Sequence, residues 1–451
     1  MLSVLRNRTY RSLFTAQVIA LLGTGMATVA LGLLAYDIAG SEAGSVLGTA
    51  LAIKMVAYVA IAPAIGAVAD RVPRRALMVG ADLTRAGVAL MLPFVDQVWQ
   101  VYVLIFLLQS ASAAFTPTFQ AVIPDVLPAE RDYTRALSLS RLAYDLESLF
   151  SPALAAALLS LVSYNWLFLG TVAGFLASAA LVVSVVLPKP VIAAVPRTGS
   201  AYAKATAGTR LFFATPELRA LLALNLAVAA ASAMVTVNSV VYVRDELGRG
   251  AADLSLALGA FGGGSMVVAL LLPRLLERVS DRTVMLRGAL LLVVAFAGLG
   301  PVTAADGGGW RWPALLLTWA VFGAACSMVL TPTGRLIRRS APPEERTPAF
   351  AAQFSLSHGC WLLTYPLAGW LGAVGGLQSA VVALGAIALL AGAIALGLWP
   401  AQDRDIESAA LVRHEHTDLP EGHPHIADAV RVVHGWRHSH PHLADTLHGQ
   451  R

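Results

Sequence analysis

Ionisable side chains within long apolar segments are the first residues of this sequence that can do chemistry. Lys54, Arg141, Asp145 and Glu147 all lie inside such segments. In the hydrocarbon core of a bilayer a charge is costly unless it is paired or hydrated, so a charge at that depth marks a candidate functional site. Such charges are typical of proton and ion pathways through membranes.

These four residues also have a spacing that suggests how they act. Arg141 and Asp145 are four positions apart and are predicted to pair on one helix face, whereas Glu147 points to another face. We expect a Lys54–Glu147 or Lys54–Asp145 pair in which a carboxylate takes up and releases a proton during transport. A static salt bridge between packed helices is the alternative.

Further polar residues in apolar segments are candidates to line a solute cavity, namely Gln109, Asn225, Asn238 and His358. The amides can equally join neighbouring helices by hydrogen bonds. An imidazole suits proton or cation transfer, and the alternative for His358 is a packing residue with its hydrogen bonds satisfied. Asp82 and Arg85, three positions apart, are predicted to form a structural ion pair.

The C-terminal tail holds a different kind of chemistry, because nine of the ten histidines lie between positions 414 and 448. Several form H-x-H pairs, whose imidazoles share one side of an extended chain and can chelate there. Imidazole suits nickel, cobalt, copper and zinc. We therefore expect the tail to bind a divalent metal, and a solvated tail with pH-dependent charge is the alternative. The candidate ligands are His414, His416, His423, His425, His438, His440 and His442.

The composition decides which class of protein holds these residues. Hydrophobic residues make up 57% of the 451 residues and charged residues only 13%, against about 25% charged residues in soluble proteins. This excludes an ordinary soluble enzyme or a disordered chain and indicates an integral membrane protein. The sequence lacks a G-K-[ST] phosphate loop, so we expect no enzymatic activity and no required cofactor. Its arginines are spread over many short segments, which argues against nucleic-acid binding.

Apolar segments recur along the chain at lengths that suit a membrane, since one span needs about 20 apolar residues. Alternate connections are rich in arginine, which places those connections and both termini in the cytoplasm. The expected fold is an all-α membrane protein with twelve transmembrane helices in two pseudo-symmetric six-helix bundles. The expected spans are 12–36, 44–69, 76–94, 98–120, 135–162, 165–187, 217–242, 252–273, 284–303, 312–333, 348–370 and 377–399.

An internal repeat supports the two-bundle organisation. Thr116-Pro117-Thr118 and Thr331-Pro332-Thr333 end matching spans, and positions 116 and 331 differ by 215. A parallel repeat of six spans implies a pseudo-twofold axis along the membrane normal. The expected domains are an N-terminal bundle at 1–187, a cytoplasmic linker at 188–216, a C-terminal bundle at 217–399 and a disordered histidine-rich cytoplasmic tail at 400–451.

The connection between the second and third spans resembles the signature loop G-x-L-x-D-R-x-G-R-R of the major facilitator superfamily of secondary transporters. The matching residues are Gly66, Asp70, Arg71, Arg74 and Arg75. Val68 and Pro73 depart from the pattern, and Ser151-Pro152 only weakly resembles the family's antiporter motif. The resemblance implies two bundles around a cavity that opens alternately to each side, with this loop as a conformational latch.

These features predict a monomeric secondary transporter of the bacterial cytoplasmic membrane whose partners are lipid, protons and a small solute or metal cation. The tail is similar in composition to the tails of nickel-resistance exporters of the superfamily. The leading expectation is therefore proton-coupled export of a divalent cation such as nickel or cobalt. The alternatives are proton-coupled efflux of drug-like organic solutes, or a metal sensor that transports nothing.

Overall fold

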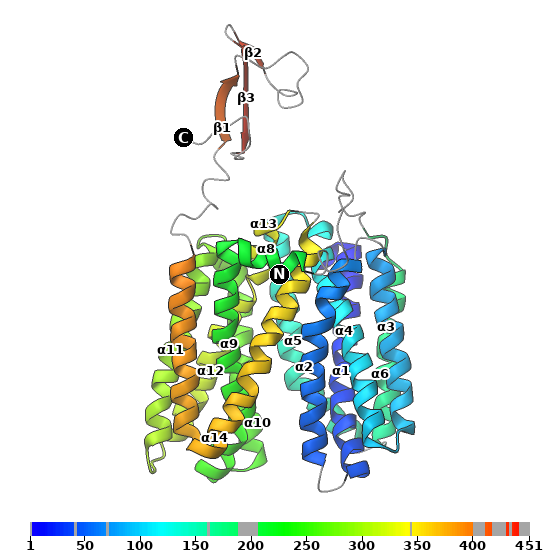
Figure 1. The fold of residues 1–451 in the computed structure, drawn as a ribbon, viewed down its shortest axis with the longest axis vertical. Coiled ribbons are helices and arrows are strands. Elements are labelled where there is room, and N and C mark those ends of the chain that lie inside the picture. Colours follow the sequence, from blue (N-terminus) through cyan, green and yellow to red (C-terminus); the bar gives the residue numbers. More distant parts are fainter. Residues whose placement is uncertain are drawn as a thin grey trace. The chain divides into compact units, whose positions relative to one another are not determined.

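The computed structural model describes residues 2–39, 43–68, 72–159, 163–187, 206–342, 345–399, 411–416, 430–432 and 435–441. The chain divides into two compact units, Met1–Trp399 and Pro400–Arg451. The first unit is a bundle of long helices, and the described part of the second is a small β-sheet (Figure 1).

The first part of the helical unit, here called the N-half, consists of long helices joined by short connections. Its elements are η1 (Leu2–Arg6), α1 (Arg8–Ala39), α2 (Ala43–Val68), α3 (Arg74–Met91), η3 (Leu92–Phe94), α4 (Val98–Val126), α5 (Glu130–Leu159) and α6 (Tyr164–Val183). Within the expected linker, residues 188–205 lie outside the described part of the chain, and the remainder contains the short helix α8 (Ala207–Ala214).

The second part, here called the C-half, begins with α8 and contains both long and short helices. Its further elements are α9 (Pro216–Val240), the π-helix η4 (Val241–Glu246), α10 (Ala251–Leu275), α11 (Asp281–Ala304), α12 (Arg311–Leu330), α13 (Thr333–Ser340) and α14 (Arg346–Leu398). The predicted spans coincide with the long helices of both halves.

Length and hydropathy suit a membrane, as the sequence predicts. In the described part of the chain, eight helices are long and apolar enough to cross a bilayer. The helices α1, α2 and α5 add segments of 32, 26 and 30 residues. The 53-residue α14 is interrupted at Gly376, whose φ of 75° favours glycine, where the last two predicted spans meet. The number of crossings and the pseudo-symmetry stay predictions.

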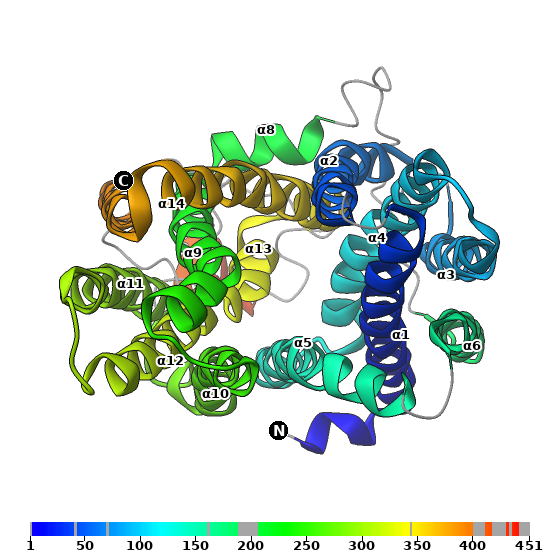
Figure 2. The ribbon, with the colours of Figure 1, turned by 90° about the horizontal axis from the view of Figure 1, so that it is seen from below.

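The two halves meet along two pairs of helices. Seen from below, α14 lies beside α2, and α10 lies beside α5 (Figure 2). Close approach inside the C-half depends on small residues: a β-carbon at Gly264 would overlap the Ala320 carbonyl oxygen, and one at Gly323 would overlap the Phe261 carbonyl oxygen. Glycine at both positions therefore allows α10 and α12 to pack backbone to backbone.

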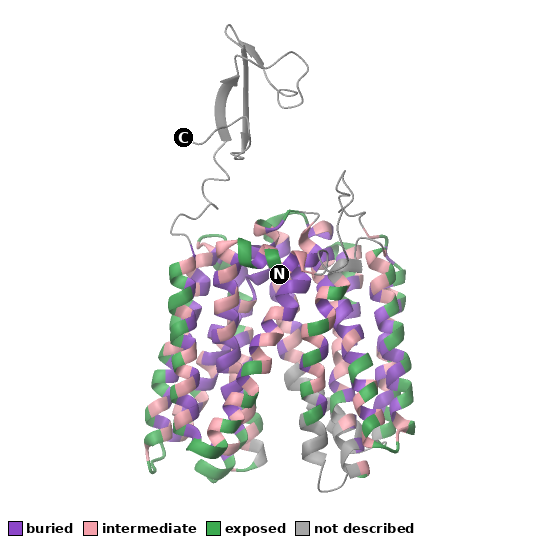
Figure 3. Cartoon of the chain, in the orientation of Figure 1, coloured by how far each residue is buried: buried purple, intermediate pink, exposed green. Residues whose placement is uncertain are grey.

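The outer surface of the helical unit is apolar, as a lipid-facing surface must be. Exposed positions run down the outside of the helices (Figure 3), and many of them are large apolar side chains such as Leu290, Leu317 and Leu363. Tryptophans gather at membrane–water interfaces. Four exposed ones lie near helix termini at the end opposite α13, namely Trp99, Trp166, Trp310 and Trp370.

The tail departs from the expectation of disorder in its described segments. Strands β1 (Leu411–His416), β2 (Val430–Val432) and β3 (Gly435–Pro441) form an antiparallel sheet in the order β1-β3-β2. The polar composition predicted that this segment cannot build a hydrophobic core. The strands pair through their backbones, and the alternating histidines of β1 and β3 are compatible with the two-residue period of a strand. His423, His425 and His442 lie outside the described residues.

Candidate functional site

An aromatic cluster lies where α2 of the N-half meets α14 of the C-half. It consists of Tyr58, Phe354, His358 and Trp361. The His358 ring lies 4.6 Å from the Tyr58 ring, 4.2 Å from the Phe354 ring and 5.0 Å from the Trp361 ring, measured between centroids. Phe354, His358 and Trp361 follow one another at spacings of four and three residues, so the helix presents all three on one face.

Polar groups within this aromatic cluster are only partly satisfied. The Tyr58 hydroxyl donates to Oε1 of Gln109 on α4 at 2.8 Å. Nδ1 of His358 lies 2.7 Å from the Phe354 carbonyl oxygen, so Nδ1 is a donor, and Nε2 is an acceptor when the ring is neutral. The buried Nε1 of Trp361 has no hydrogen-bond partner among the described residues. The cluster therefore offers ring faces together with a donor and an acceptor.

Lys54 brings a positive charge to the edge of this cluster. Its Nζ lies 5.7 Å from the centroid of the Tyr58 ring, four residues further along α2. The carboxylate of Glu147 on α5 lies within electrostatic range of this ammonium.

Arg141 and Asp145 form the predicted ion pair on α5, with Nη2 and Oδ1 2.9 Å apart. A third residue, Ser265 on α10, joins them from the other half. Its hydroxyl donates to Oδ2 of Asp145 at 2.6 Å and accepts from Nε of Arg141 at 3.1 Å. Asp145 and Ser265 are both buried. A carboxylate of the N-half is therefore hydrogen-bonded to a residue of the C-half deep inside the molecule.

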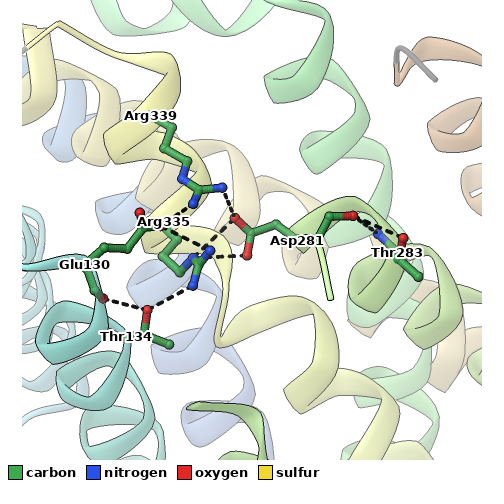
Figure 4. A network of polar contacts seen from close by, with 7 residues as sticks. Glu130, Thr134, Asp281, Thr283, Arg335 and Arg339 are labelled. Carbon is green, nitrogen blue, oxygen red and sulfur yellow. Dashed lines mark hydrogen bonds and ion pairs between the residues drawn. The ribbon is translucent and has the colours of Figure 1, made fainter. Parts of the chain in front are cut away.

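A network of ion pairs joins the two halves at the end of the unit that carries α13 (Figure 4). We call it the inter-half ion network, and its members are Glu130, Asp281, Arg335 and Arg339. Arg335 lies 3.1 Å from Glu130 and 3.2 Å from Asp281, and Arg339 pairs with the same two carboxylates. Glu130 belongs to the N-half, whereas the other three residues belong to the C-half.

Asp281 and Arg335 form the buried part of the inter-half ion network, whereas Glu130 and Arg339 are partly exposed. The Asp281 side chain is only 2% exposed and that of Arg335 only 8%. Nη1 of Arg335 also donates to the Thr134 hydroxyl at 3.1 Å. Beside it, Arg338 lies over the Tyr133 ring with its guanidinium carbon 5.2 Å from the centroid. These contacts hold α13 against the start of α5.

The predicted latch loop is described in part. Arg74 pairs with Asp125 at the end of α4 at 2.6 Å, and Arg346 at the start of α14 lies 3.6 Å from the same carboxylate. Arg75 donates to the Val183 carbonyl oxygen. Asp70 and Arg71 lie outside the described residues, and nothing is described of the Gly66 environment. Asp125 thus joins a signature arginine to the C-half.

The remaining predicted polar residues join helices. Nδ2 of Asn225 donates to Oε1 of Gln353 at 3.2 Å, and Nδ2 of Asn238 donates to the Ala368 carbonyl oxygen at 3.5 Å, so both amides connect α9 to α14. These contacts are hydrogen bonds between helices, which is the alternative role that the sequence allows for the two amides.

Asp82 and Arg85 form the predicted ion pair inside the N-half. The Ser178 hydroxyl donates to Asp82 at 2.7 Å. The guanidinium carbon of Arg85 lies 4.5 Å from the ring centroids of Phe115 and of Phe175. The pair is enclosed by α3, α4 and α6, which suits the structural role predicted for it.

Sequence reasoning missed the inter-half ion network, the role of Ser265 and the contribution of Tyr58. Arg335 and Arg339 lie in one of the arginine-rich connections, whose composition indicates only the side of the membrane that it faces. Ser265 carries no charge, so it gives no signal within an apolar segment. In the part of the chain that the structure describes, no three His, Cys, Asp or Glu side chains are already gathered as metal ligands.

The helices and the contact between the halves define a multi-pass membrane protein of the transporter class. Residues 13–312 and 221–438 match the Major Facilitator Superfamily, and the chain belongs to this family. Its fold is similar to that of the human organic anion transporter MFSD10, with a TM-score of 0.69 at 14% identity over 86% of this chain and 99% of that one. A bacterial homologue of the iron transporter ferroportin in an outward-facing state gives a TM-score of 0.67 at 15% identity, over 86% and 99% of the two chains.

Two curated relatives are bacterial macrolide efflux proteins. Macrolide efflux protein A of Enterococcus faecalis is 31% identical over 153 residues, which are 32% of this chain and 47% of that protein. Its namesake from Streptococcus pyogenes is 32% identical over 149 residues, which are 32% of this chain and 36% of that protein. The chain therefore matches less than half the length of these relatives.

Proposed function

We propose that this chain is an exporter of the bacterial cytoplasmic membrane that expels ring-bearing, drug-like organic solutes in exchange for protons. The observation that carries the proposal is the aromatic cluster of Tyr58, Phe354, His358 and Trp361 between the halves. Sites for organic molecules are lined mainly by aromatic and apolar side chains with a few placed polar groups. The names of the macrolide efflux relatives support the same substrate class.

In this proposal the solute stacks on the aromatic cluster and accepts a hydrogen bond from Trp361. The buried Nε1 of Trp361 has no hydrogen-bond partner among the described residues, and a buried donor without a partner costs free energy. A solute carbonyl or ether oxygen would remove that cost. Because Tyr58 and Phe354 come from opposite halves, movement of one half against the other would dismantle the cluster and release the solute.

The arginine-rich end that carries α13 is taken as cytoplasmic, with both termini on that side. The inter-half ion network then holds the cytoplasmic end shut, and its ion pairs must separate before solute can enter from inside. Ion pairs suit this task because water replaces their contacts when they part. In this proposal Asp125 and Arg346 act together with the signature loop as the conformational latch.

Proton coupling is assigned to the carboxylates on α5. The Ser265 hydroxyl reaches Asp145 from the C-half at 2.6 Å, so separation of α5 from α10 removes a hydrogen bond from the carboxylate. A carboxylate that loses such a bond changes its affinity for protons. Glu147, whose charge acts on Lys54 next to the aromatic cluster, would link the same proton to the solute.

Export of nickel or cobalt, the leading expectation from the sequence, finds no support in the comparisons with known proteins. Everted membrane vesicles with an imposed proton gradient would distinguish the substrates. We expect gradient-driven uptake of a labelled macrolide or an aromatic dye, and its loss when the gradient is collapsed. Uptake of labelled nickel without uptake of any organic probe would overturn the proposal. A Pro400 truncation serves as a control, since transport in this proposal does not require the tail.

A further inference from the structure

The strand register of the tail places histidines next to one another across β1 and β3. His414 lies directly opposite His438, His416 opposite Trp436, and Val412 opposite His440. Alternate residues of a strand share a face, and residues directly opposite each other share it too. His414, His416, His438 and His440 therefore fall on one face of the sheet.

The other face has a different composition. There Glu415 lies opposite Arg437, and Arg413 lies opposite Ser439. A carboxylate opposite a guanidinium stabilises an antiparallel pair, whereas like residues such as two imidazoles give no comparable charge pairing. The histidines and the charged residues thus fall on opposite faces of the β1–β3 pair.

We propose that His414 and His438, directly opposed on β1 and β3, together with His416 or His440 on the same face, form a site for one divalent transition-metal ion of the zinc, nickel and cobalt class. Directly opposed residues have β-carbons about 4.5–5.5 Å apart, and diagonal ones about 7–8 Å. Such ions bind imidazole nitrogen at about 2.0–2.1 Å. His416 and His440 lie four register positions apart, about 13 Å along the strands, so one ion can be shared by the central pair and only one of these two.

Four of the seven candidate ligands of the tail share this face, and the register accounts for their H-x-H spacing. In a helix, residues i and i+2 point to different faces, whereas in β1 and β3 they share one. One H-x-H pair comes from each strand, 414/416 and 438/440, and the hairpin joins them. This site belongs to the tail and is independent of the proposed substrate of the helical unit.

Metal binding to the purified full-length chain, carrying no polyhistidine tag, tests the proposal. Equilibrium dialysis against zinc, nickel and cobalt chlorides is expected to show one ion bound per chain. The double variant His414→Ala/His438→Ala removes the directly opposed pair and is expected to weaken binding by about tenfold or more. The matched control His423→Ala/His425→Ala also removes an H-x-H pair, outside the described strands, and is expected to leave the affinity within about threefold.

A second variant tests the register without touching the ligands. Arg413→Cys/Ser439→Cys places thiols directly opposite each other on the other face, at a spacing that a disulfide can bridge. We expect the disulfide to form in metal-free protein and metal binding to persist. Absence of bound metal in the full chain, equal losses in both histidine pairs, or failure of the disulfide to form would each overturn the proposal.

Discussion

The contact between the two halves has a charged end and an aromatic interior, and the two parts hold the halves together by different means. At the charged end, Glu130 and Asp281 share Arg335 and Arg339. In the interior, the ring of Tyr58 packs against those of Phe354 and His358. The charged groups of an ion pair can form hydrogen bonds with water when the pair separates. An aromatic surface that becomes exposed to water is instead stabilised by contact with another ring. The charged end therefore suits a gate, and the aromatic interior suits a solute.

Removal of Asp281 is expected to have the largest effect on the charged end. Asp281→Asn removes the buried carboxylate that the two arginines share and leaves them the carboxylate of Glu130, whose side chain is 45% exposed. Loss of one partner from a buried ion pair costs about 3–5 kcal/mol. Leu137 of α5 packs against Gly334 of α13. We expect the α13 end to open, so that Leu137→Cys reacts with a maleimide in a background without Cys326 and Cys360. Unchanged labelling would show that the network does not hold this end shut.

Asp145→Asn is expected to separate transport from the proton gradient. The asparagine side chain has the size of the aspartate and can still form a hydrogen bond with Ser265. It cannot take up a proton at physiological pH. Proton-driven accumulation of solute should be abolished, whereas exchange of labelled for unlabelled solute should continue. Glu147→Gln tests the second carboxylate in the same assay. Full proton-driven transport by one variant would remove that residue from the coupling scheme.

Tyr58→Phe is expected to have a moderate effect on the aromatic interior. The ring stays in place, but the hydrogen bond of 2.8 Å to Gln109 is lost. This bond within the protein positions the ring and contributes about 1 kcal/mol, so solute affinity should fall by at most about fivefold. Solute binding measured by equilibrium dialysis tests this. A complete loss of binding would show that the hydroxyl contacts the solute itself.

Arg131→Ala is expected to have the smallest effect, although Arg131 also joins the halves. Its pair with Glu277 has a length of 2.7 Å, but the two side chains are 65% and 42% exposed. Exposed ion pairs contribute about 1 kcal/mol or less. The maleimide assay should therefore give nearly wild-type labelling. Opening as large as that of Asp281→Asn would mean that the number of ion pairs matters more than their burial.

Much of the fold follows from local properties of the sequence. Hydropathy predicts the positions of the long helices, and glycine at 376 falls where the last two spans meet. Pairs that lie within one helical turn were also predictable: Arg141 with Asp145, and Asp82 with Arg85. These features depend on helix geometry alone, so the sequence contains all the information that they require.

Contacts between distant parts of the chain were not predictable in the same way. Arg339 and Glu130 are 209 residues apart, and Tyr58 and His358 are brought together only by the packing of α2 on α14. The alternating histidines of the tail are compatible with strands, but the low hydrophobicity of the tail favoured the prediction of disorder. The tail sheet depends on pairing between strands, which no single segment reveals.

Binding of a labelled macrolide to three purified tryptophan variants tests the aromatic site most directly. Trp361→Ala removes the ring and its unpartnered Nε1, Trp361→Phe removes only the Nε1, and Trp370→Ala removes an exposed ring of the same helix. An aromatic contact contributes about 0.5–1.5 kcal/mol, so we expect up to about tenfold weaker binding for Trp361→Ala. Trp361→Phe should be intermediate and Trp370→Ala unchanged. Equal affinity in Trp361→Ala and Trp370→Ala would contradict the proposed solute site.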